Sequence, residues 1–96
     1  MTGPAIHMYG TEWCPDCWRS KRLLDRLGVP YRWTNISNDE QAQEFVTSVN
    51  RGMRSVPTIV FPDGSVLVEP SDAELVKKLA ALGIATASPP VIPKRP

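Results

Sequence analysis

The sequence has few residues that could carry chemistry, and its charge is balanced. Its 96 residues include two cysteines and one histidine, and 11 basic residues nearly offset 10 acidic ones, which gives a formal net charge of +1. A balanced charge creates no general field that would attract nucleic acid or an anionic membrane. We therefore expect neither nucleic acid nor a membrane surface among its partners.

Long apolar runs are also missing. No stretch approaches the roughly 20 apolar residues that a membrane-spanning helix needs. The first residues lack the basic and apolar regions of a secretion signal. We therefore expect a cytoplasmic protein, and in that reducing compartment a pair of cysteines is more often catalytic or metal-binding than a structural disulfide.

What the sequence does have is the composition of one small globular domain. Apolar residues make up 42% and charged residues 22%, whereas a disordered chain has a lower apolar fraction or a strong net charge. The composition changes only in the last dozen residues, which hold four of the ten prolines and too little apolar area to offset ordering entropy. We predict a monomeric domain over residues 1–84 and a flexible proline-rich tail over residues 85–96.

Hydrophobic periodicity predicts alternating strands and helices. Apolar stripes at helical spacing predict three helices, at about 15–27, 39–51 and 72–82. Capping-box patterns at residues 37–40 and 71–74 support the starts of the last two. Short runs rich in β-branched or aromatic residues predict four strands, at 5–9, 31–36, 58–61 and 65–68. The order β-α-β-α-β-β-α predicts an α/β fold in which three helices pack on one mixed sheet of four strands.

Both cysteines lie where the first predicted strand meets the first predicted helix, in the segment Trp13-Cys14-Pro15-Asp16-Cys17. Cys14 occupies the N-cap position, where free backbone N–H groups and the helix dipole stabilise a thiolate. Cys17 lies one turn further on the same face, within the reach of a disulfide bond. We therefore predict a redox-active dithiol in which Cys14 attacks and Cys17 resolves.

A metal site is the alternative use of these cysteines. Zinc usually takes four protein ligands, and the chain offers Cys14, Cys17 and the distant His7 as good ones. An iron–sulfur cluster would have to be shared between two chains. A non-enzymatic module that holds zinc or a cluster therefore stays open beside the dithiol enzyme.

The sequence resembles the glutaredoxin-like branch of the thioredoxin superfamily, and within it the actinobacterial mycoredoxins. The resemblance covers about residues 5–83 and rests on the W-C-P-D-C segment, Ser55-Val56-Pro57 before the third strand, the Asp63-Gly64-Ser65 turn and the order of elements. It implies a minimal thioredoxin-like fold and a thiol-disulfide oxidoreductase acting on disulfide-containing or thiolated proteins. It also implies a low-molecular-weight thiol as co-substrate, a reductase of that thiol system as partner, and no tightly bound cofactor.

The resemblance further implies which residues surround the dithiol. Pro57 would follow a cis peptide bond opposite the cysteines, and the backbone of Val56 would hydrogen-bond the substrate as an added strand does. Trp13 could offer a flat apolar surface to a partner or simply pack on the first helix, and Arg54 could contact the thiol or be an ordinary surface residue. The other implied contacts are Pro15 and Asp16 for the substrate, and Thr11, Gly64 and Ser65 for the thiol.

One departure from the family pattern concerns the identity of the thiol. Glutaredoxins that use glutathione usually carry a cation shortly before the motif and a tyrosine between the cysteines, whereas this sequence has Glu12 and Asp16 there. These acids would repel the carboxylates of glutathione. Mycothiol, a cysteinyl pseudodisaccharide, has no free carboxylate. We therefore predict mycothiol rather than glutathione as co-substrate.

A second departure concerns the reductase. Electron donors to ribonucleotide reductase of the same fold, the NrdH-redoxins, carry a Trp-Ser-Gly-Phe-Arg-Pro segment toward their end. This sequence has Glu69-Pro70-Ser71-Asp72-Ala73 in that region. An NrdH-like redoxin that receives electrons from thioredoxin reductase is therefore the second interpretation within the same class.

Overall fold

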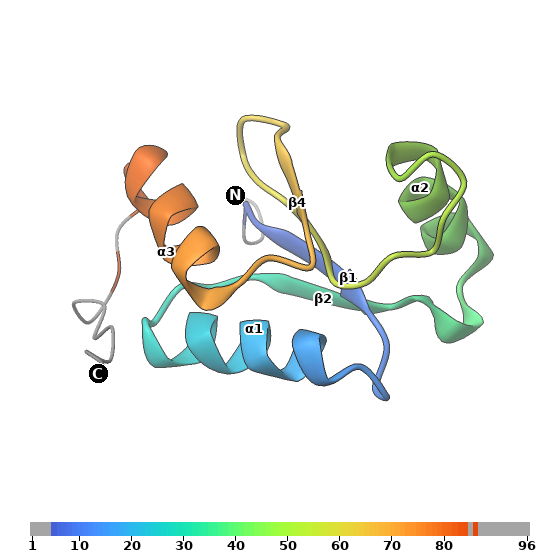
Figure 1. Cartoon of the computed structure of the whole chain (residues 1–96), viewed down its shortest axis with the longest axis horizontal. Helices are drawn as coiled ribbons and strands as arrows, with labels where there is room; N and C mark the ends of the chain where they lie inside the picture. The colour runs from blue at the N-terminus through green and yellow to red at the C-terminus, as the bar shows by residue number, and fades with distance from the viewer. Residues whose placement is uncertain (1–4, 85, 87–96) are drawn as a thin grey trace.

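The computed structural model describes residues 5–84 and 86 and shows one sheet with helices packed around it (Figure 1). The strands are β1 (His7–Gly10), β2 (Arg32–Asn35), β3 (Thr58–Val60) and β4 (Val66–Val68). The helices are α1 (Pro15–Arg26), α2 (Glu40–Val49) and α3 (Asp72–Ala81), and a short 3₁₀ turn, η1 (Ile36–Asn38), joins β2 to α2. The predicted fold class and order of elements are confirmed.

The four strands form a mixed sheet in the order β2-β1-β3-β4. β1 runs parallel to β2, with Met8 opposite Trp33, and antiparallel to β3, with Met8 opposite Ile59. β3 and β4 form the antiparallel hairpin expected from the Asp63-Gly64 turn. The parallel pair requires a crossover, and α1 provides it.

Alternating residues of the strands supply two cores, one on each face of the sheet. Met8 and Ile59 are fully buried on one face, where they pack with Leu24 of α1 and Leu75 of α3. On the opposite face, α2 packs through a smaller cluster made of Ile36, Ala42 and Val46 with Tyr9, Phe45 and Val56. Figure 1 shows α1 and α3 near each other and α2 at the other end of the sheet. The larger core therefore supports the helix that begins at the cysteines.

The helix starts follow local sequence signals, with one correction. The box at the start of α3 forms as predicted, because Ser71 and Glu74 each accept a hydrogen bond from the other's backbone N–H. The box predicted at residues 37–40 does not cap α2. Asp39 is the N-cap there and accepts from the N–H of Ala42, because the residues before it form the 3₁₀ turn.

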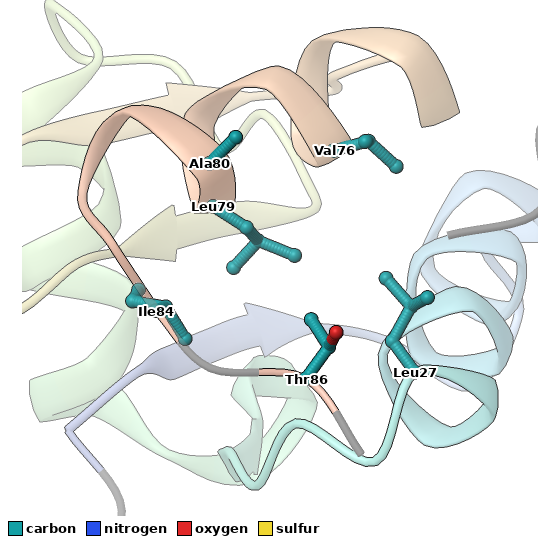
Figure 2. A pocket seen from close by; sticks show the side chains of 6 residues that line it. All are labelled: Leu27, Val76, Leu79, Ala80, Ile84 and Thr86. Atoms are coloured by element: carbon teal, nitrogen blue, oxygen red, sulfur yellow. The ribbon is translucent and has the colours of Figure 1, made fainter. Parts of the chain in front are cut away.

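At the far end of the helices, an apolar hollow of about 150 Å³ separates the end of α1 from α3. Figure 2 shows the side chains that line it: Leu27, Val76, Leu79, Ala80, Ile84 and Thr86. The cysteines lie at the opposite, N-terminal end of α1. The hollow is therefore separate from the dithiol.

Two further sequence predictions concern the tail and membrane-spanning helices. Apart from Thr86, the predicted tail lies outside the described residues, so the boundary between residues 84 and 85 stays a prediction. Within residues 5–84 and 86, no helix is long and apolar enough to span a bilayer.

Candidate active site

The two cysteines meet at the start of α1. Cys14 is the N-cap, with extended backbone angles (φ −93°, ψ 110°), and Pro15 occupies the first helical position, where its missing N–H costs nothing. The backbone N–H of Cys17 donates to Sγ of Cys14 at 3.1 Å. Both residues are free thiols, and the Cys14 side chain is half-buried whereas Cys17 is fully buried. The arrangement presents one sulfur to solvent and keeps the second behind it.

The buried thiol of Cys17 resists ionisation. Its pKa is raised from 9.0 to about 12, chiefly by burial and secondly by the hydrogen bond with the Cys14 side chain. Gly10 at the end of β1 makes room for this sulfur, because a Cβ there would lie 2.5 Å from Sγ of Cys17 and 2.7 Å from the ring of Trp33. A negative charge shared by the pair is therefore better placed on Cys14.

The segment before β3 faces the exposed sulfur. The Val56–Pro57 peptide bond is cis, as the resemblance implied. The Cys14 thiol lies 3.7 Å from the carbonyl oxygen of Val56, to which it can donate. On the other side of this segment, the N–H of Glu69 donates to the carbonyl of Pro57 at 2.9 Å. The backbone at Val56 is thus held against the nucleophile by its neighbours.

Asp16, between the cysteines, does not stand alone. Its carboxylate lies 3.0 Å from the guanidinium of Arg19, which also lies 3.5 Å from Asp72 at the start of α3. The same guanidinium donates to the carbonyl of Pro70 at 3.3 Å. The three charged side chains, which we call the Asp16–Arg19–Asp72 cluster, carry a net charge of −1.

Large aromatic side chains flank the dithiol. Trp13 is 80% exposed, which does not fit the alternative that it packs on α1. Trp18 is half-exposed, and its ring N–H donates to the carbonyl of Glu12 at 2.9 Å. The ammonium of Lys21 lies 4.7 Å from the ring centre of Trp18 and 4.0 Å from that of Trp33. Trp33 is partly buried against the main core.

The remaining predicted site residues lie in three places. Thr11 lies at the dithiol, where its backbone lowers the pKa of the Cys17 thiol and so opposes part of the effect of burial. Arg54 is exposed in the loop before Val56 and lines a shallow polar hollow along α2. Gly64 and Ser65 form the β3–β4 turn, where Asp63 accepts from the N–H and hydroxyl of Ser65. Pro57 precedes β3 and the turn follows β3, so the two lie at opposite ends of this strand. The structure therefore does not bring Gly64 and Ser65 to the dithiol.

The sequence analysis did not predict the ion pairs of Arg19 with Asp16 and Asp72, or the close approach of Gly10 to Cys17. The spacing of Asp16 and Arg19 is a helical i, i+3 pair, so this contact could have been predicted. The contact with Asp72 could not, because it depends on how α3 packs beside α1.

The metal alternative would use His7 together with the two cysteines, but only the cysteines lie next to each other. His7 begins β1, the strand whose far end leads to Cys14, and its Nε2 lies 2.7 Å from the hydroxyl of Thr34. Within the described part of the chain, no group of three or more histidine, cysteine or acidic side chains is arranged to hold a metal ion. The site could offer a metal the two cysteine sulfurs.

Comparisons with known proteins agree with this geometry. The glutaredoxin family model matches residues 6–67. Mycoredoxin 1 of Corynebacterium glutamicum is 40% identical over 77 residues, which cover 80% of this chain and 95% of the relative. A Mycobacterium tuberculosis protein named as a glutaredoxin is 42% identical over 82 residues, which cover 85% of this chain and 98% of the relative. The crystal structure of a Methanosarcina mazei glutaredoxin superposes with a TM-score of 0.67 at 28% identity, covering 82% of this chain and 84% of the other. The chain belongs to the glutaredoxin family and is a thiol-disulfide oxidoreductase.

Proposed function

We propose that this protein reduces mixed disulfides between mycothiol and proteins or small molecules, with Cys14 as the nucleophile and Cys17 as the resolving thiol. The observation that carries these roles is the hydrogen bond from the Cys17 N–H to Sγ of Cys14. It stabilises negative charge on the half-buried sulfur, whereas burial raises the pKa of Cys17 to about 12. The two sulfurs thus differ in their access to solvent and in the hydrogen bond that each receives.

The reaction is a sequence of thiol-disulfide exchanges. The Cys14 thiolate attacks the mycothiol sulfur of the mixed disulfide, forms a Cys14–mycothiol disulfide and releases the target thiolate, which takes up a proton. In the monothiol route, a second mycothiol thiolate attacks the adduct, which gives mycothiol disulfide and frees Cys14. In the dithiol route, Cys17 loses its proton and attacks Sγ of Cys14, which releases mycothiol and leaves a Cys14–Cys17 disulfide for an external two-electron reductant.

The surroundings of Cys14 suggest how the target disulfide is held. Val56 faces the sulfur from an irregular segment that leads into β3, and its backbone could pair with an extended substrate segment. Trp13 is exposed beside the nucleophile and could pack on the substrate's apolar side chains. Pro15 and Asp16 complete the rim, and Thr11 and Arg54 remain candidates for the thiol.

Charge favours mycothiol as the small thiol. The Asp16–Arg19–Asp72 cluster is net negative even though Arg19 compensates one acid. Two further acidic residues are exposed nearby in the chain: Glu12, two residues before Cys14, and Glu69, whose N–H binds the carbonyl of Pro57. Such a rim disfavours the carboxylates of glutathione more than a thiol without carboxylates. The similarity to a mycoredoxin supports the same choice. We further propose a cytoplasmic monomer that works with a reductase of the mycothiol system.

Turnover on one common disulfide tests this function. Reduced mycothiol with its reductase, glutathione with its reductase, and thioredoxin reductase alone are supplied in parallel at equal electron-donor concentration. We expect the mycothiol system to give the highest kcat/KM. Equal or faster turnover with thioredoxin reductase alone would instead identify an NrdH-like redoxin.

Metal analysis separates the enzyme from a binding module. The protein is purified without oxygen and its zinc and iron content is measured together with its free thiols. We expect two titratable thiols and substoichiometric metal. Stoichiometric metal that blocks both cysteines would contradict the redox assignment.

A further inference from the structure

Arg19 connects the dithiol helix to the start of α3. Its guanidinium lies 3.0 Å from Asp16 and 3.5 Å from Asp72, and it donates to the carbonyl of Pro70 at 3.3 Å. A planar guanidinium spreads its N–H groups over three nitrogens in a fixed fork, so it can serve three separate oxygen acceptors in a defined orientation. Arg19 therefore has one defined place on the rim of the site.

The position of Arg19 matters because its positive charge compensates part of the negative charge of Asp16 and Asp72. Asp16 is separated from Cys14 by one residue, and Asp72 begins the helix that follows Glu69, whose N–H binds the carbonyl of Pro57. Asp16 thus belongs to the dithiol segment itself, and Arg19 joins Asp72 to it. With Arg19 the cluster carries a charge of −1, and without it the same cluster would carry −2.

The geometry points to Arg19 as a specificity-determining residue: by holding Asp16 and Asp72, it sets the charge that the site presents to small thiols and disulfides. This inference rests on thiol-disulfide exchange at Cys14, not on mycothiol as the natural co-substrate. The three side chains are 41–49% exposed, so solvent screens the effect. We expect it to appear as a preference between charged and neutral substrates.

The test compares two disulfides that differ in charge. Reduced protein is mixed with glutathione disulfide, which is anionic, or with bis(2-hydroxyethyl) disulfide, which is neutral. In each case the Cys14–Cys17 dithiol is oxidised to a disulfide, and one disulfide molecule takes up two electrons and two protons to become two thiols. The second-order rate constants are measured by stopped flow, and their ratio, anionic over neutral, is the readout.

Charge arithmetic gives the expected order of the ratios. Arg19→Gln should lower the ratio by roughly threefold, the size expected for one unit charge about 6 Å away in water. Asp16→Asn should raise it by a similar factor, and Asp16→Asn with Arg19→Gln should return it close to the native value. Because the Debye length falls to about 3 Å at 1 M ionic strength, all these differences should shrink toward onefold there.

Arg26→Gln is the matched control. It removes the same charge from the same helix, seven residues and about 10 Å further from the site. A ratio that is unchanged in Arg19→Gln, or that falls as much in Arg26→Gln, would overturn the inference. A loss of general reactivity in a folded variant slows both disulfides and leaves the ratio informative. If the native protein exchanges with neither disulfide, the proposed function fails instead.

Discussion

The backbone N–H of Cys17 donates to the sulfur of Cys14 at 3.1 Å, so the two thiols are joined by a contact that depends on the first turn of α1. Because it is a backbone group, this donor survives replacement of the Cys17 side chain. A replacement of the Cys17 side chain therefore removes the resolving thiol but keeps the hydrogen bond that stabilises the Cys14 thiolate.

That separation predicts the effect of replacing each cysteine. Cys14→Ser should lose all turnover, because a serine hydroxyl does not ionise near neutral pH. Cys17→Ser should keep exchange between Cys14 and a mixed disulfide but lose oxidation to an internal disulfide. Both activities are measured as thiol release, from a mixed disulfide and from a symmetrical disulfide. An active Cys14→Ser protein together with an inactive Cys17→Ser protein would reverse the two roles.

The raised pKa of Cys17 predicts a loss of stability in alkali. The folded value of about 12 lies above the ordinary 9.0, so the unfolded chain gives up this proton first. The contribution is complete below about pH 9 and is lost as the pH rises toward 12. Urea unfolding of the reduced protein at several pH values measures this change.

Cys17→Ala is the control for the alkaline loss. The pKa of Tyr31 is also raised to about 12, by burial and by a hydrogen bond with Asp25, and so it titrates in the same range. Because the variant keeps this tyrosine, only the cysteine contribution should disappear and the loss between pH 9 and 12 should be smaller. An identical pH dependence in both proteins would show that Cys17 does not titrate as described.

Ser20 on α1 predicts a stabilising substitution. The residue is fully buried, and within the described part of the chain its hydroxyl finds no hydrogen-bond partner. Ser20→Ala removes this desolvated group and improves helix propensity, so we expect the free energy of unfolding to rise by about 1 kcal/mol. Ser48→Ala on α2 is the comparison, because that hydroxyl donates to the carbonyl of Phe45 and is exposed. A less stable Ser20→Ala protein would mean that the hydroxyl has a partner.

Gly10 predicts a substitution that damages both fold and chemistry. A Cβ there would lie 2.5 Å from Sγ of Cys17 and 2.7 Å from Trp33. Gly10→Ala should lower the free energy of unfolding by about 1–3 kcal/mol, as overpacking does, and should slow formation of the internal disulfide. In a Cys17→Ala background the cost to stability should be smaller, because one of the clashing atoms is gone. Equal costs in both backgrounds would place the strain elsewhere.

Local sequence signals were enough to predict much of this protein. The N-cap position of Cys14, the turn that brings Cys17 back to it and the capping box of Ser71 and Glu74 all depend on neighbouring residues. The mixed sheet followed from the parallel β-α-β start and the antiparallel final hairpin. Chain order should also have excluded Gly64 and Ser65 from the site. Their hairpin turn follows β3, whereas Val56 and Pro57, which face the dithiol, precede it.

Contacts across the fold could not be predicted in this way. Asp16 was expected to add negative charge near Cys14, and the structure shows in addition that Arg19 holds it in an ion pair that continues to Asp72. The space beside Gly10 likewise depends on how β1 lies against Cys17 and Trp33. These relationships depend on the packing of elements that are far apart in sequence.

The β3–β4 turn has a practical consequence. Gly64 has a φ of +85°, and a Cβ there would have nothing within 4 Å, so the turn projects into open solvent. It also lies at the end of the hairpin away from the residues that face Cys14. A fluorophore attachment point or a short affinity epitope inserted at this turn would therefore let captured or labelled protein be followed while the dithiol stays free to react.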